Sequence, residues 1–168
     1  MSVNIDSAEF RRILGHYPTG VCAVTANVDG APVGMVVGSF TSVSLDPPLV
    51  AFFPDRKSTT WPKIEAAGRF CVNVLAHHQR DVCRALSSKA ENKFEGVRHR
   101  LSGHGQPIIE DIVAWIDCDL DAVHEAGDHY IVIGRVLSLD VAHPHDPLLF
   151  LKGGYGQFAA IAESDPGR

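Results

Sequence analysis

Four hydroxyl side chains gather in the apolar segment GMVVGSFTSVSLDPPLV, residues 34 to 50. They are Ser39, Thr41, Ser42 and Ser44, and an Asp-Pro-Pro corner follows them. A half-buried strand needs polar residues on one face only, so amphipathicity does not explain hydroxyls on both faces. Hydroxyls and backbone N–H groups with few charges suit a hydrogen-bond-rich ligand that carries a phosphate, such as a flavin. The alternative is a β-sandwich strand in which Ser and Thr are simply compatible with extended backbone.

Composition indicates one globular domain. The chain has 168 residues, 45% hydrophobic and 21% charged, which suits a sizeable core. A net charge of −5 disfavours nucleic acids and anionic membranes as partners, because an acidic surface repels phosphate. Asp6 and Glu9 precede any apolar run, and no window reaches the ~20 apolar residues of a membrane span. The sequence therefore predicts a cytoplasmic protein without signal peptide or membrane anchor.

Other motifs that carry chemistry are missing from the sequence. No C-x-x-C pair occurs among the four cysteines, which are Cys22, Cys71, Cys83 and Cys118, so we expect buried, reduced thiols. The nine histidines form no H-E-x-x-H or comparable helical pair, so we expect no metal site. There is no Rossmann G-x-G-x-x-G, no P-loop and no G-x-S-x-G elbow.

Short strands with few helices account for most of the chain. Asp6 and Glu9 have capping-box spacing and begin an amphipathic helix that Pro18 ends. Strands are predicted over 21–26, 33–37, 39–45, 49–53, 70–75, 113–123, 130–141 and 148–151, with an Asp29-Gly30 hairpin turn. Short helices are predicted from Ser58 or Thr59 to residue 67, with Gly68 closing the first, and over 79–86. A polar loop at 87–96 is expected to be functional or mobile. Few crossover helices separate the strands, which favours an antiparallel barrel over a doubly wound sheet.

Six segments in order resemble the short-chain flavin reductases, the reductase components of two-component flavin-dependent monooxygenases. They are FRRILGHYPTGVCAVTA (10–26), GMVVGSFTSVSLDPPLVAFF (34–53), DRKSTTW (55–61), GRFCVNVL (68–75), KFEGV (93–97) and AGDHYIVIGRV (126–136). The resemblance implies a mainly β, split-barrel (Greek-key antiparallel β-barrel) flavin-binding fold with a few short flanking helices. It also implies a single domain over 1–168, with its core at about 10–158 and a loose tail from Ala162.

The same resemblance assigns site residues. Ser39 and Thr41 would bond flavin ring or ribityl oxygens, the backbone at 35–37 would line the ring edge, and Ser58 and Thr59 would meet the phosphate with charge from Arg56 or Lys57. The full cofactor-binding set is Met35, Val36, Val37, Ser39, Phe40, Thr41, Pro54, Asp55, Lys57, Ser58, Thr59, Thr60 and Tyr155. Without the resemblance, a helix cap with a solvated basic pair is the preferred interpretation of the 55–60 segment.

His129 is the predicted catalytic residue. In the Gly127-Asp128-His129 turn it would hold the dihydronicotinamide over the flavin, and Asp128 would fix its tautomer or cap the turn. The resemblance thus implies an NAD(P)H:flavin oxidoreductase that reduces FMN or FAD and passes the flavin to a separate monooxygenase. We expect NADH to be preferred over NADPH, because the sequence shows no basic pair for a 2′-phosphate beyond Arg56 and Lys57. We also expect a homodimer. The alternatives are a split-barrel oxidase or oxygenase with bound flavin, and a non-catalytic flavin carrier.

Overall fold

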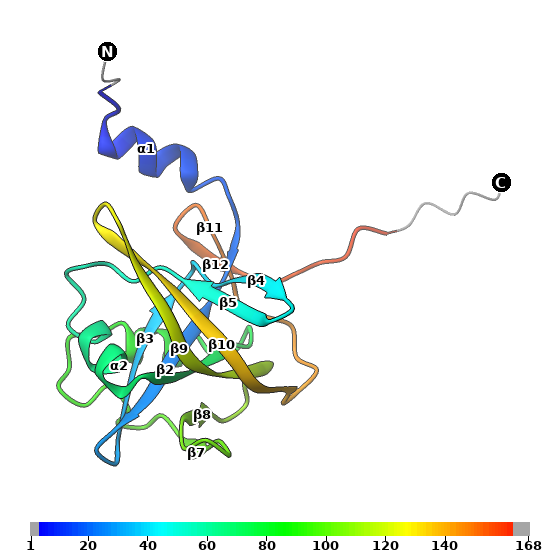
Figure 1. Ribbon diagram of the computed structural model, residues 1–168. Coiled ribbons are helices and arrows are strands. Elements are labelled where there is room, and N and C mark those ends of the chain that lie inside the picture. Colours follow the sequence, from blue (N-terminus) through cyan, green and yellow to red (C-terminus); the bar gives the residue numbers. More distant parts are fainter. Residues whose placement is uncertain (1–3, 163–168) are drawn as a thin grey trace.

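The computed structural model of the protein describes residues 4–162 (Figure 1). Its helices are α1 (Ser7–Leu14), α2 (Trp61–Ala67) and α3 (Arg80–Leu86). Its strands are β1 (Thr19–Gly20), β2 (Cys22–Val28), β3 (Ala31–Val37), β4 (Thr41–Leu45), β5 (Pro48–Phe52), β6 (Arg69–Val74), β7 (His99–Leu101), β8 (Pro107–Ile109), β9 (Ala114–Ala126), β10 (His129–Val141), β11 (Leu149–Leu151) and β12 (Gly154–Gly156). Beyond Ala162, the tail that was predicted to be loose lies outside the described residues. None of the helices within 4–162 has the length and apolar character that a membrane crossing requires.

Seven strands form one curled antiparallel sheet in the order β3-β2-β6-β9-β10-β5-β4. The long β9–β10 hairpin crosses the middle of the molecule, and α2 lies beside β2 and β3 (Figure 1). Two small sheets, β1-β11-β12 and β7-β8, flank the large one. The mainly β, antiparallel fold with few short helices is as the sequence predicts.

The central strands are buried on both faces. Val24, Phe70 and Val72 face one apolar cluster, and alternate residues such as Ala23 and Cys71 face a second cluster under α3 and β8. This follows from the two-residue period of a strand, which sends successive side chains to opposite faces. Helix α2 joins the first cluster through Trp61 and Ile64, which are 2% and 1% exposed. The segment that leads into α2 is therefore held firmly against the barrel.

Local sequence signals set several turns and helix ends. Asp29 and Gly30 have φ angles of 51° and 85°, as the predicted Asp-Gly hairpin turn between β2 and β3 requires. Gly68 ends α2 with φ 69°, a conformation that a side chain would disfavour. Asp6 caps α1 by accepting a hydrogen bond from the Ala8 N–H at 3.2 Å.

Helix α1 has none of its residues buried and stands away from the sheet (Figure 1). Phe10, Ile13 and Leu14 on this helix are 52–54% exposed. Its Glu9 bonds to Arg12 at 2.7 Å and 2.8 Å instead of returning to the N-cap, so the capping box forms only through Asp6. The helix therefore exposes an apolar stripe that no part of the described chain covers.

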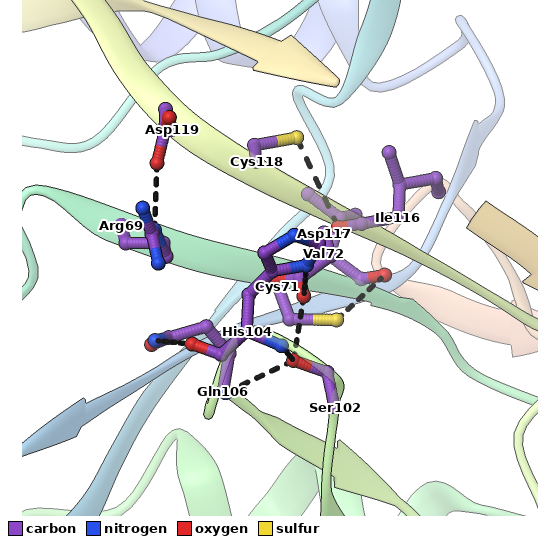
Figure 2. Close-up of polar contacts among 10 residues, drawn as sticks. All are labelled: Arg69, Cys71, Val72, Ser102, His104, Gln106, Ile116, Asp117, Cys118 and Asp119. Carbon is purple, nitrogen blue, oxygen red and sulfur yellow. Dashed lines mark hydrogen bonds and ion pairs between the residues drawn. The ribbon is translucent and has the colours of Figure 1, made fainter. Parts of the chain in front are cut away.

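A buried carboxylate ties the β7–β8 hairpin to β9. Figure 2 shows Asp117 of β9 between Ser102 and His104 of the hairpin loop, with hydrogen bonds to both. Asp117 is fully buried, and its Oδ1 has no hydrogen-bond partner among the described residues. The sequence predicted neither strand of this hairpin, because each has only three residues and depends on contacts distant in the chain.

Candidate functional site

A cavity of about 820 Å³ opens between β3, the 57–60 segment before α2, and the loop that follows α3. Met35 and Val36 of β3 form one wall, and Ser58, Thr59 and Thr60 form another. The third wall is the 87–93 part of the polar loop that the sequence marked as functional or mobile. The structure thus brings together three segments that are far apart in the sequence.

Lysines dominate the charge of this cavity. The chain has five lysines, and Lys57, Lys63, Lys89 and Lys93 all line the cavity, where Glu91 is the single acidic lining residue. The Lys93 ammonium group donates a hydrogen bond to Thr60 Oγ1 at 3.0 Å. Burial and the neighbouring Lys63 lower the pKa of Lys93. The cavity is therefore suited to an anionic ligand.

Ser58 both caps α2 and faces the cavity. Its Oγ accepts hydrogen bonds from the backbone N–H groups of Trp61 at 3.1 Å and Thr60 at 3.3 Å. Ser58 thus bonds the first N–H of α2, although the N-cap residue of the helix is Thr60, whose own side chain makes no capping hydrogen bond. A hydroxyl that accepts from the backbone keeps its own hydrogen, so Ser58 can still donate to a ligand.

A second group of predicted site residues, Ser39, Asp55 and His129, lies outside this cavity and is linked to it by the 53–57 segment. Ser39 Oγ accepts a hydrogen bond from Phe53 N at 2.9 Å, which fastens the 38–40 connection to the end of β5. Asp55 then forms an antiparallel bridge with His129, supported by bonds from Tyr130 N to Pro54 O at 3.0 Å. The 53–57 segment thus joins the His129 turn to the cavity wall at Lys57.

His129 begins β10 and is held by its neighbour. Its Nδ1 lies 2.7 Å from Asp128 Oδ1. This hydrogen bond and the charge of the imidazole lower the pKa of Asp128. Arg56 is directed elsewhere, with its guanidinium group 5.4 Å from the centroid of the Tyr130 ring and its Nη1 3.4 Å from Gly127 O. Lys57 is therefore the member of the basic pair that faces the cavity.

The remaining predicted residues divide between these places and others. Val37 is buried in the barrel with Phe40 packed against the same cluster, whereas Thr41 lies exposed on β4 and donates to Ser42 O at 3.3 Å. Tyr155 lies apart from both groups: its hydroxyl is 3.1 Å from Cys83 Sγ of α3, and Arg80 lies over its ring. Sequence reasoning did not assign Lys63, Ser87, Ser88, Lys89 or Lys93, and the polar 87–96 loop was the signal that could have located most of them.

The Ser102, His104 and Asp117 cluster is not a nucleophilic triad. Both Ser102 Oγ and His104 Nδ1 bond to the same Asp117 oxygen, instead of Ser bonding to His. Ser102 is 7% exposed and its Oγ also accepts from two backbone N–H groups, so it serves to hold the loop. Residues 4–162 also contain no group of three or more His, Cys, Asp or Glu side chains that could hold a metal ion.

Comparison with known proteins gives a consistent result. The family model for the flavin reductase like domain matches residues 14–159. A flavin reductase of Pseudomonas putida is 65% identical over 158 residues, covering 94% of this chain and 93% of the relative. The reductase subunit HsaB of a flavin-dependent monooxygenase from Mycobacterium tuberculosis is 47% identical over 157 residues, covering 92% and 84%. The solved NADH:FAD oxidoreductase SgcE6 of Streptomyces globisporus C-1027, in complex with NAD and FAD fragments, superposes with a TM-score of 0.88 at 33% identity, covering 94% and 96%. The chain therefore belongs to the flavin reductase-like family, whose split-barrel fold it shares.

Proposed function

We propose that this protein is an NADH:flavin oxidoreductase that reduces FMN or FAD by hydride transfer and supplies reduced flavin to a separate monooxygenase. The observation that carries the proposal is the continuous strip from the His129 turn, through the 53–57 segment, to the lysine-lined cavity. One end offers an imidazole and the other offers cations and hydroxyls. Relatives named as flavin reductases and as a monooxygenase reductase subunit support the same conclusion.

The residues present fit a flavin phosphate and ring. Lys57 and the hydroxyls of Ser58 and Thr59 converge on one wall of the cavity, where phosphate oxygens would accept hydrogen bonds from them. Met35 and Val36 supply half-buried apolar surface and backbone groups on the facing wall. These residues join a donor-rich end to an apolar wall, which matches a flavin mononucleotide.

When bound, the flavin supplies the two-electron acceptor, and the chain supplies binding and orientation. Asp128 holds one nitrogen of His129, so the other nitrogen of the ring can bond the carboxamide of a dihydronicotinamide. Hydride transfer needs no strong base, so holding the donor at a near-attack distance is the role that we propose for His129.

Steady-state kinetics test this function. We expect NADH oxidation by the purified protein to depend on added FMN or FAD, and NADPH to be the poorer donor. Turnover after flavin has been stripped to undetectable levels would refute the proposal. Flavin that stays bound through gel filtration, together with slow NADH oxidation, would instead favour the oxidase alternative.

We also propose that the protein is a homodimer in a reducing compartment, consistent with the cytoplasm. The exposed apolar stripe of α1 supports dimerisation, because a helix with no buried residue gains most of its stability from packing against another surface. The four cysteines are all buried and unpaired, which fits a compartment that keeps thiols reduced. Light scattering at micromolar concentration would reveal the oligomeric state.

A further inference from the structure

The cavity holds more positive charge than the 57–60 segment alone provides. Lys57 lies with Ser58 and Thr59 on the wall that precedes α2, whereas Lys63 comes from α2 and Lys89 and Lys93 come from the loop after α3. Such a concentration is unusual in a chain whose net charge is −5. A solvated surface would show lysines spread among acids instead.

These lysines also lack the partners that the arginines have. Every ion pair within 4.0 Å among residues 4–162 uses an arginine or a histidine, and none uses a lysine. Lys93 is half-buried, its ammonium group is held 3.0 Å from Thr60 Oγ1, and the nearby Lys63 disfavours its charge. Neighbouring ammonium groups disfavour one another's charge, and an anion bound between them offsets that repulsion.

We propose that Lys63, Lys89 and Lys93 form a second anion subsite, the lysine subsite, which binds the diphosphate bridge of a dinucleotide, and that this dinucleotide is FAD. The inference rests on the proposed function, which places the flavin phosphate at the 57–60 segment. FMN ends at that phosphate, whereas FAD continues with a second phosphate and an adenosine. The lysine subsite lines the same cavity as that segment, together with Ser87 and Ser88. The second phosphate and the adenosine of FAD would extend into this part of the cavity. At about 820 Å³, the cavity has the size of sites that hold whole cofactors.

A binding experiment tests the lysine subsite without relying on turnover. The double variant Lys63→Gln/Lys89→Gln removes two charges and keeps a polar, hydrogen-bonding side chain at each position. It spares Lys93, whose bond to Thr60 holds the loop in place. Fluorescence titration with FAD and with FMN would give the two dissociation constants. Lys152→Gln is the matched control, because Lys152 is the one lysine of the chain outside the cavity. Circular dichroism would confirm that each variant is folded.

We expect the double variant to bind FAD about three- to tenfold more weakly than the wild type. FMN binding should change by less than about twofold. ADP should compete with FAD more weakly in the double variant than in the wild type. Equal weakening for FAD and FMN would overturn the proposal, because the lysines would then act as a general field around one phosphate. Unchanged FAD binding with a raised KM for NADH would overturn FAD as the source and assign the diphosphate to the nicotinamide dinucleotide. Failure of the wild type to bind or reduce any flavin would instead refute the proposed function.

Discussion

Replacing His129 with alanine should separate nicotinamide positioning from flavin binding. The side chain is held by one hydrogen bond, from Nδ1 to Asp128 at 2.7 Å, and lies half-exposed at the start of β10. Its backbone bridge to Asp55 does not involve the imidazole, so His129→Ala leaves the 53–57 segment in place. We therefore expect the flavin dissociation constant to change by less than about twofold.

The expected loss follows from one hydrogen bond to the nicotinamide carboxamide. A neutral hydrogen bond contributes a net of about 0.5–1.5 kcal/mol, so the rate constant for flavin reduction should fall about two- to twelvefold. A larger loss would indicate that the imidazole also fixes the reaction distance. Stopped-flow absorbance would measure reduction at saturating flavin, and its dependence on NADH concentration would report nicotinamide binding. His129→Gln, which keeps an amide donor, should recover part of the rate.

A nearby histidine provides the control. His124 lies exposed on β9, in the same hairpin as His129, and is paired with Ile131. His124→Ala should leave both reduction and flavin affinity unchanged. If His129→Ala instead lost flavin and kept a normal reduction rate for the flavin that remained, the assignment of the Gly-Asp-His turn to nicotinamide would be wrong.

Three further substitutions and one thiol assay test the structure. Ser58→Ala should weaken FMN binding, which a fluorescence titration would measure. Because the hydroxyl accepts a hydrogen bond from the first N–H of α2, the change should also lower the free energy of unfolding by about 1 kcal/mol and Tm by about 2–4 °C in thermal melting. Leu14→Arg should weaken the proposed dimer, and unchanged light scattering would contradict a role for α1 in dimerisation. Asp117→Ala should lower the free energy of unfolding in urea by about 2–4 kcal/mol, because it leaves the buried Ser102 hydroxyl hydrogen without an acceptor; activity per folded molecule should be retained. Burial raises the pKa of Cys118 to about 12, so Ellman's reagent at pH 8 should find no reactive thiol in the native protein and four after denaturation.

Local chemistry made the larger elements predictable. The Asp29-Gly30 turn set the β2–β3 hairpin, and Gly68 set the end of α2, because each residue adopts a backbone conformation that few others tolerate. Strand alternation found β6, β9 and β10 to within a few residues of their observed ends. The two- and three-residue strands β1, β7, β8 and β12 were missed, since so few residues carry no periodicity and pair only through tertiary contacts.

The sequence predicted the segments that line the candidate site, but it did not predict the cluster of lysines there. Residues 35–36 and 57–60 were found as sequence segments, and the structure places both on the cavity. Lys63 and Lys89 carried no local signal, because one lies on a short helix and the other in a polar loop where lysine is ordinary. Only the folded chain shows that they face the same space. From the sequence alone, Arg56 and Lys57 were the basic residues assigned to a flavin phosphate.

Two of the serines predicted to bind the flavin, Ser39 and Ser58, make hydrogen bonds that the sequence could not show. Ser39 and Ser58 each accept hydrogen bonds from backbone N–H groups, at Phe53 and at Trp61 respectively. Those bonds occupy lone pairs and leave each hydroxyl hydrogen as the group that remains to be donated. Lys57, whose ammonium group can only donate, lies beside Ser58 on the wall of the cavity, so that wall presents donors to a ligand. A ligand that binds this wall must supply acceptors, as the phosphate oxygens of the proposed flavin would.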